Sequence, residues 1–278
     1  MHTKKIAIIG AGNMGSCLLG GLIASKYSEV WISNPSLSKL NALQEKYHAK
    51  FNITTSNMEA AKTADVILFA VKPLILPKVL IELADIINLN KPLIISTAAG
   101  VYENIIQHFL QAPSSIIRAM PNTPAMLGCG ASALFANAHV TAEEREIAEN
   151  IFRAVGIVTW VTSEKLMDIV TAVSGCGPAY FFLIMEAIQN AGISLGLSPE
   201  IARLLTLQTA YGAARMALES EKNVTELRAQ VTSKGGTTEE AIQVLESANI
   251  RDIFSRAIKA ADLRAEALAG IIAKELEP

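Results

Sequence analysis

The pattern of apolar and polar positions divides the chain into two parts that differ in secondary structure. In the first part, short apolar runs of strand length alternate with segments of helical periodicity, which predicts an α/β fold with a doubly wound sheet. Several of these runs are apolar on both faces, as is typical of buried parallel strands. The expected strands lie at 6–9, 29–33, 65–71, 93–97, 115–120, 131–135 and 157–161.

From residue 163 onward the pattern predicts helices and no further strand. Pro178 and Pro199 stand at positions where the first turn of a helix tolerates proline. The segment 180–185 is apolar all round, so we expect it to be buried on every side. One small helical domain cannot bury that much surface, and a second subunit is expected to cover it. The expected helices span 164–173, 178–195, 199–220, 224–230, 238–247 and 252–274.

Gly10, Gly12 and Gly15 follow the first apolar run and precede a helix. In that setting G-x-G-x-x-G is typical of a dinucleotide-binding turn, whose glycines allow the tight turn, the approach of a pyrophosphate and close helix packing. The N–H groups and positive dipole end of the helix would meet the phosphates. A glycine turn needed for packing alone is the alternative. We therefore expect an N-terminal Rossmann domain that binds NAD(P) at 1–162, followed by an all-α dimerisation and substrate domain at 163–278.

Composition narrows the range of partners. The chain has 278 residues and a formal net charge of -2 without a Lys/Arg cluster, so nucleic acid is not an expected partner. No uncharged apolar run approaches the roughly 20 residues of a membrane span, so no membrane is expected. The three cysteines and four histidines show no ligand spacing, so no metal site is expected. We read the chain as a cytoplasmic protein.

The region about 20 residues past the glycine turn bears on the choice between NADPH and NADH. An NAD site usually carries an acid there, whereas this chain has Ser33, Asn34 and Ser36, followed by Lys39. Hydroxyls, an amide and a cation suit a 2′-phosphate, which favours NADPH, with NADH as the alternative. The same residues also fit an ordinary turn before a helix.

Further cofactor contacts are expected where the parallel strands end, because ligands of open α/β sheets bind outside the carboxyl ends of the strands. The strand at 65–71 runs into Lys72-Pro73, the next ends in small residues, and the strand at 115–120 ends in a proline-rich loop. The residues concerned are Ala70, Val71, Lys72, Pro73, Ala98, Met120, Pro121 and Asn122.

A second helix start with glycines lies at 231–240, with the sequence VTSKGGTTEE. Thr237 is expected to cap this helix together with Glu240, three residues on. Gly235 and Gly236 would leave backbone N–H groups exposed to a small anion, and a carboxylate of modest size would fit there. A plain helix cap with a flexible glycine joint is the alternative.

Taken together, five motifs resemble those of pyrroline-5-carboxylate reductases. GAGNMG, DVILFAVKP, MPNTP, VSGCGPAY and SKGGTT occur in the order and spacing of that family, over nearly the whole chain. The resemblance implies NAD(P)H-dependent reduction of 1-pyrroline-5-carboxylate to L-proline, the last step of proline biosynthesis. It also implies a Rossmann domain and a helical domain that interlocks with its partner in a homodimer, often assembled further into a ring of dimers.

The resemblance also implies roles for single residues. Thr238 would orient the ring nitrogen of the substrate, and Glu221 or a water would supply the proton. Asn57 aligns with an asparagine that contacts the cofactor. The substrate carboxylate is expected on Ser233, Gly235, Gly236 and Thr237. The expected cofactor residues are Gly10, Gly12, Asn13, Met14, Gly15, Ser33, Asn34 and Asn57, together with those at the strand ends.

The chain departs from the family pattern at three positions. Lys234 stands where the family usually has proline, which adds a charge beside the carboxylate site. Pro35 stands where many members have an arginine for the 2′-phosphate, which weakens the case for NADPH. Cys176 replaces a common serine, a change between small side chains that should be tolerated.

Reducing a cyclic imine requires a hydride at carbon and a proton at nitrogen, but neither a metal nor a covalent nucleophile. Two other functions remain open. A β-hydroxyacid or imine reductase of the same architecture would typically use a lysine in the interdomain helix, which here has only Lys165 at its start. A protein that senses NADPH without turnover would have no use for a second anion-binding helix start.

Overall fold

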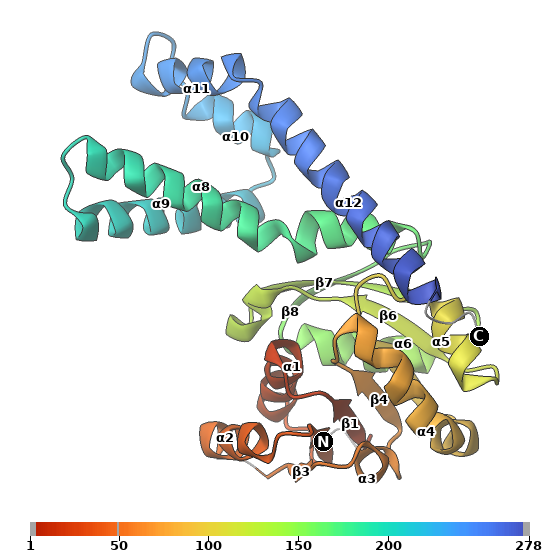
Figure 1. The fold of residues 1–278 in the computed structure, drawn as a ribbon. Helices are drawn as coiled ribbons and strands as arrows, with labels where there is room; N and C mark the ends of the chain where they lie inside the picture. The colour runs from red at the N-terminus through yellow and green to blue at the C-terminus, as the bar shows by residue number, and fades with distance from the viewer. Residues whose placement is uncertain (1–3, 49, 275–278) are drawn as a thin grey trace. The chain divides into compact units, whose positions relative to one another are not determined.

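The structure is a computed structural model that describes residues 4–48 and 50–274. Its contacts group the chain into two compact units. Figure 1 shows the chain coloured by residue number. The sheet unit comprises Met1–Cys176 and Ala260–Pro278, and the helical unit comprises Gly177–Lys259. In this grouping, residues 163–176 and 260–274 fall with the sheet, although the expected all-α domain at 163–278 includes them.

The sheet unit is built on an eight-stranded sheet in the order β3-β2-β1-β4-β5-β6-β7-β8. Every neighbouring pair is parallel except β6 and β7. The strand order reverses direction between β1 and β4, which confirms the doubly wound sheet. The strands are β1 (Ile6–Ile9), β2 (Val30–Ser33), β3 (Asn52–Thr54), β4 (Val66–Phe69), β5 (Leu93–Ser96), β6 (Ile116–Met120), β7 (Gly130–Ala136) and β8 (Gly156–Trp160).

Helices cover both faces of this sheet (Figure 1). Successive residues of β1 point to opposite faces: Ile6 and Ile8 pack with α1 and α6, while Ala7 and Ile9 pack with α4 and α5. A capping box between Thr141 and Glu144 fixes the start of α6. The helices of this unit are α1 (Asn13–Ala24), α2 (Leu37–Tyr47), α3 (Asn57–Ala61), α4 (Leu76–Asn90), α5 (Glu103–Leu110), α6 (Ala142–Arg153) and α7 (Leu166–Val170).

Three shorter helical turns and the end of the last long helix complete the sheet unit. The 3₁₀ turns span Pro73–Ile75 and Thr123–Leu127, and a π-helix spans Thr171–Gly175 directly after α7. The last helix, α12 (Ile250–Lys274), has its C-terminal part in this unit. Ile272 is fully buried there in the same core as α4 and α5.

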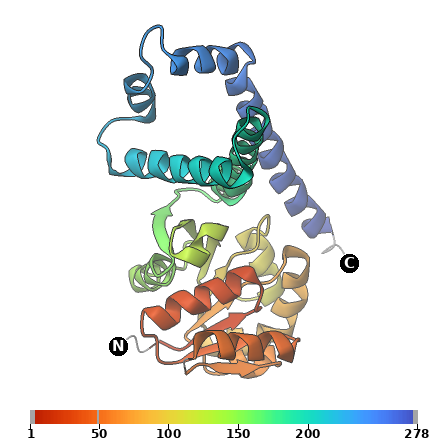
Figure 2. The ribbon, with the colours of Figure 1, turned by 90° about the vertical axis from the view of Figure 1, so that its left-hand side faces the viewer.

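The helical unit contains α8 (Gly177–Ser194), α9 (Pro199–Glu219), α10 (Val224–Gln230), α11 (Thr237–Ser247) and the first part of α12. Figure 2 shows the loop that joins α10 to α11. Phe181, Phe182 and Leu183 remain 64%, 63% and 66% exposed in the single chain. The chain alone therefore leaves the 180–185 segment uncovered, and the expected burial on every side needs a second subunit. By length and composition, the helix Leu166–Ser194 could cross a membrane, although core helices of other proteins also meet that test.

Candidate functional site

The glycine turn has the geometry that a dinucleotide site requires. Gly10 has a φ of +107°, and a Cβ there would lie 2.7 Å from the Ala70 carbonyl oxygen. A Cβ at Gly12 would meet no heavy atom within 4 Å, so the space beside the start of α1 is open. Gly12 is the N-cap of α1 without a side-chain cap, and no acid lies in the first turn, which begins with Asn13 and Met14. The positive end of α1 is therefore available to a phosphate.

The other expected cofactor residues gather at one edge of the sheet. Strands β1, β4, β5 and β6 run parallel as neighbours, so their carboxyl ends meet at that edge. The Ala70 N–H donates to the Ile9 carbonyl at 2.8 Å, which holds the end of β4 beside the glycine turn. Residues that follow these strand ends are Ala70, Val71, Lys72, Pro73, Ala98, Pro121 and Asn122, and Met120 closes β6.

Ser33 and Asn57 lie side by side although they are 24 positions apart. Ser33 Oγ donates to Asn57 Oδ1 at 2.7 Å, and Asn57 Nδ2 donates to Glu82 Oε2 at 2.9 Å. Asn57 therefore connects the end of β2 to a carboxylate of α4. The sequence offered no signal for Glu82, since it lies on a helix that the motifs do not include.

The start of α2 gathers small polar groups. Asn34 Oδ1 accepts the Ser36 N–H at 2.9 Å, which forms the expected turn, and the hydroxyls of Ser36 and Ser38 are 2.9 Å apart. Ser36 is the N-cap of α2 without a side-chain cap, and the first turn of the helix has no acid. These hydroxyls and backbone N–H groups suit an anion.

The side chain of Asn122 is bound to neighbouring protein groups on both sides. Its Oδ1 accepts the Ala131 N–H at 2.9 Å, and its Nδ2 lies 3.2 Å from the Ser174 carbonyl oxygen and 3.3 Å from Ser174 Oγ. Asn122 thus ties the loop after β6 to β7 and to the π-helix. A cofactor contact through this amide would have to replace one of these bonds.

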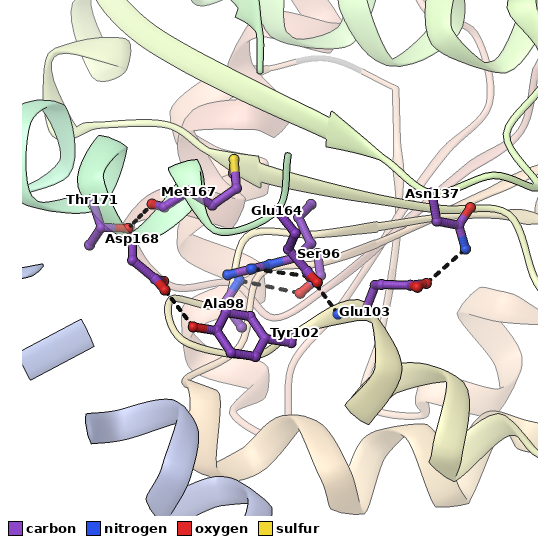
Figure 3. Close-up of polar contacts among 10 residues, drawn as sticks. Ser96, Ala98, Tyr102, Glu103, Asn137, Glu164, Met167, Asp168 and Thr171 are labelled. Carbon is purple, nitrogen blue, oxygen red and sulfur yellow. Dashed lines mark hydrogen bonds and ion pairs between the residues drawn. The ribbon is translucent and has the colours of Figure 1, made fainter. Parts of the chain in front are cut away.

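Sequence reasoning missed a buried polar cluster that joins β6, the start of α5 and α7. Figure 3 shows its contacts. Arg118, at the centre of β6, is 2% exposed, and its Nη1 lies 3.1 Å from Glu164 Oε1. Its guanidinium also lies 5.0 Å from the centre of the Tyr102 ring. The Tyr102 hydroxyl donates to Asp168 Oδ2 at 2.5 Å. A charged residue inside an otherwise apolar strand was the signal that could have revealed this cluster.

Burial shifts the titration of two members of this cluster. Burial, together with the bond to Asp168, raises the pKa of the Tyr102 hydroxyl, which therefore remains a donor. Burial also raises the pKa of the Glu164 carboxyl, although the Arg118 guanidinium acts in the opposite direction. Glu164 accepts the Glu103 N–H at 2.6 Å as well, so the cluster connects β6, the start of α5 and the residues before α7.

The second glycine loop opens α11 in the helical unit. Gly235 has a φ of +71°, and its N–H donates to Glu239 Oε2 at 2.6 Å. The Gly236 N–H donates to the Ser233 carbonyl oxygen at 3.0 Å. Gly236 is the N-cap of α11 and has no side-chain cap. The predicted cap of Thr237 on Glu240 is wrong, because the helix begins at Thr237 and the acid that reaches back is Glu239.

Glu221 belongs to the same unit as this loop, in the turn between α9 and α10. It is exposed, as are Ser233, Thr237 and Thr238. The next helix, α10, is fixed by a capping box between Asn223 and Glu226. Glu221 and the 233–238 loop thus flank the two ends of α10. Among the described residues, no group of three or more His, Cys, Asp or Glu side chains could hold a metal ion.

Comparison with known protein families gives two matches. A family model described as pyrroline-5-carboxylate reductase dimerisation matches residues 164–268. A model described as NADP oxidoreductase coenzyme F420-dependent matches residues 5–100. The exposed apolar helices of the helical unit therefore fall within a region related to a dimerisation domain, which supports their burial in an oligomer.

Several relatives are similar over nearly their whole length. The pyrroline-5-carboxylate reductase of Pseudomonas aeruginosa is 44% identical over 97% of this chain and 98% of its own. That of Vibrio alginolyticus is 42% identical over 96% of this chain and 98% of its own. Among solved structures, a pyrroline-5-carboxylate reductase from Coxiella burnetii has a TM-score of 0.90 at 48% identity, covering 96% of this chain and 99% of its own.

A pyrroline carboxylate reductase from Plasmodium falciparum, solved with NADP bound, has a TM-score of 0.85 at 31% identity and covers 97% of this chain and 99% of its own. With relatives this similar over nearly its full length, the chain belongs to the pyrroline-5-carboxylate reductase family of NAD(P)-dependent oxidoreductases.

Proposed function

We propose that this protein reduces 1-pyrroline-5-carboxylate to L-proline with NAD(P)H, the final step of proline biosynthesis. The observation that carries the proposal is the 44% identity to a pyrroline-5-carboxylate reductase over 97% of the chain, a span that includes both glycine-bearing helix starts. One of these starts suits a diphosphate and the other suits a small carboxylate.

The sheet unit is assigned to the cofactor. The backbone N–H groups of Gly12, Asn13, Met14 and Gly15 would bind the pyrophosphate at the start of α1. Small residues at the ends of β4, β5 and β6 would line the nicotinamide half, with Asn122 contributing its backbone because its amide is already bonded. The cofactor supplies a hydride when it is bound.

NADPH is proposed as the preferred cofactor. Ser36 and Ser38 place two hydroxyls 2.9 Å apart at the start of α2, where the first turn carries no acid. Ser33, Asn34, Asn57 and Lys39 extend this polar group. A 2′-phosphate would gain bonds there, whereas the ribose hydroxyl of NADH would lack the carboxylate that it usually meets.

The helical unit is assigned to the substrate. Ser233, Gly235, Gly236 and Thr237 would bind the carboxylate at the start of α11, with Gly236 allowing a close approach rather than donating, because its N–H is bonded to the Ser233 carbonyl oxygen. Thr238, in the first turn of that helix, would donate to or accept from the ring nitrogen and so orient the C=N bond. A threonine hydroxyl is too weak an acid to protonate the imine alone, so Glu221 or a water is assigned as the proton source.

The assembly is proposed to be a homodimer formed through the helices of residues 163–278, with a ring of dimers as its larger form. Phe181, Phe182 and Leu183, each more than 60% exposed in the single chain, support this surface as the interface. The cytoplasm is the proposed location. Cys17, Cys129 and Cys176 are all free, which agrees with a reducing compartment.

The test is an NADPH oxidation assay with 1-pyrroline-5-carboxylate as substrate. A β-hydroxyacid panel and thiazolidine carboxylate oxidation run in parallel separate the proposed activity from that of a hydroxyacid dehydrogenase. Turnover with the pyrroline and L-proline as product supports the proposal, while turnover only with a hydroxyacid, or none with any substrate, contradicts it. Values of kcat/KM for NADPH and NADH then decide the cofactor preference.

A further inference from the structure

The loop that opens α11 already contains a bound carboxylate from its own chain. Glu239 lies in the first turn of α11, and its Oε2 accepts the Gly235 N–H at 2.6 Å. A backbone N–H that donates to an ionised carboxylate makes a charge-assisted bond, which is stronger than a neutral one. The same N–H is one of those proposed to bind the carboxylate of 1-pyrroline-5-carboxylate.

The surroundings of Gly235 allow a ligand to replace this side chain. A Cβ built on Gly235 would meet no heavy atom within 4 Å, so the space beside the residue is open. The neighbouring Gly236 N–H points elsewhere, to the Ser233 carbonyl oxygen at 3.0 Å. Glu239 is only half-buried, so its carboxylate can turn into solvent when another acceptor arrives.

We propose that Glu239 competes with the substrate carboxylate for the Gly235 N–H and thereby sets the KM for 1-pyrroline-5-carboxylate. This inference rests on the proposed function. One N–H cannot make a full hydrogen bond to two anions, so a bound carboxylate must displace Glu239. The substrate therefore exchanges one charge-assisted bond for another and gains little from this contact alone.

Such an exchange also favours the substrate over other small anions. An anion that contacts only the Gly235 N–H gains almost no binding free energy, because it replaces the equivalent hydrogen bond of Glu239. A ligand that also contacts Ser233, Thr237 or Thr238 retains the free energy of those contacts. Glu239 thus acts as a specificity-determining residue, because it makes binding depend on the rest of the substrate.

A purely structural role for Glu239 predicts the opposite kinetic effect. An acid in the first turn that reaches back to an N–H before the helix resembles a capping box and stabilises the helix start. If that were its whole role, removing the carboxylate would loosen the loop and raise KM. Competition predicts that KM falls, so the sign of the change separates the two roles.

The experiment compares Glu239→Gln with Glu240→Gln in the full-length protein, by NADPH oxidation with 1-pyrroline-5-carboxylate. Both variants remove one negative charge from the first turn of α11, but within the described residues only Glu239 bonds the loop. Glu239→Gln is expected to lower KM by about three- to tenfold relative to Glu240→Gln, the range that one hydrogen bond of ordinary net strength gives. Equal KM values, or a higher KM in Glu239→Gln, would overturn the inference.

Two further measurements keep the test decisive. Glu239→Asp retains the charge but shortens the side chain, so it should also lower KM if occupancy of the N–H matters rather than charge. The inhibition constant of tetrahydrofuran-2-carboxylate, a ring acid that cannot be reduced, should fall in parallel, while the KM for NADPH stays unchanged. If the wild-type protein turns over the pyrroline but these constants do not move, the inference fails and the proposed function stands; if it has no such turnover, the proposed function fails.

Discussion

Replacing Glu164 with glutamine should destabilise the sheet unit strongly, because it removes the carboxylate that is paired with the buried Arg118 charge. The Arg118 side chain is 2% exposed and that of Glu164 is 22% exposed, with 3.1 Å between Nη1 and Oε1. A guanidinium cannot lose its proton in a protein, so the charge remains buried in the variant. Breaking one side of a buried ion pair costs about 3–5 kcal/mol of unfolding free energy.

The hydrogen bonds that glutamine can still accept reduce that figure for Glu164→Gln. The glutamine oxygen can still accept from Arg118 or from the Glu103 N–H, which is bonded at 2.6 Å in the wild type. A retained neutral hydrogen bond contributes about 1 kcal/mol, so the expected loss is about 2–4 kcal/mol. Arg118→Met should cost less, about 1–3 kcal/mol, because the Glu164 carboxylate that it leaves behind reaches water and keeps its backbone donor.

The assay is urea unfolding of the wild type, both single variants and the double variant, at one fixed protomer concentration because dimerisation affects stability. The double variant has neither charge, so its loss should be smaller than the sum of the single losses by at least about 1 kcal/mol. A matched control is Arg153→Met, which removes an exposed partner of Glu149 and should cost less than about 1 kcal/mol. The reasoning is refuted if Glu164→Gln costs no more than this control, or if the losses of the single variants add.

Three further predictions concern the site and its pH dependence. Thr238→Ala should lower kcat at least about tenfold, the equivalent of one hydrogen bond of about 1.4 kcal/mol, and leave NADPH affinity near normal; an equal loss of NADPH binding would show that the assigned role is wrong. Gly236→Val should raise the KM for the substrate, because a Cβ there would lie 3.0 Å from the Ser233 carbonyl oxygen, and an unchanged KM would remove this loop from the substrate site. Burial raises the pKa of Glu164 in the folded state above its ordinary value of 4.5. Between pH 4.5 and the folded-state pKa, the folded protein therefore binds more protons at this group than the unfolded chain does. The contribution of Glu164 to the free energy of unfolding should fall as pH rises through this range. Unfolding of the wild type and Glu164→Gln as a function of pH tests this, since the variant should lack that component of the slope, and identical slopes would contradict it.

The sequence alone determined the architecture of both parts of the chain. Continuous apolar runs such as 66–69 cannot place a polar face in water, so they had to be strands buried between two layers of helices. The glycine turn could be placed because G-x-G-x-x-G stands between a strand pattern and a helix pattern. The structure adds the reason for Gly10, since its φ of +107° and a Cβ only 2.7 Å from the Ala70 carbonyl oxygen exclude a side chain there. The edge strand Asn52–Thr54 escaped prediction, since it is short and only partly buried. These features could be predicted because each depends on residues that are close together in the chain.

Tertiary structure decided every contact between residues that lie far apart in the chain. Nothing in the local pattern links Ser33 to Asn57, or Arg118 to Glu164, because the strand order that brings them together depends on the packing of the whole sheet. The C-terminal part of α12 reads as an ordinary amphipathic helix, yet Ile272 is buried in the core of the sheet unit. At α11, the sequence predicted a cap between Thr237 and Glu240, whereas the backbone path through Gly235 and Gly236 brings the Gly235 N–H to Glu239. A side chain's partner depends on where the backbone directs it, and that direction is set by the folded chain as a whole.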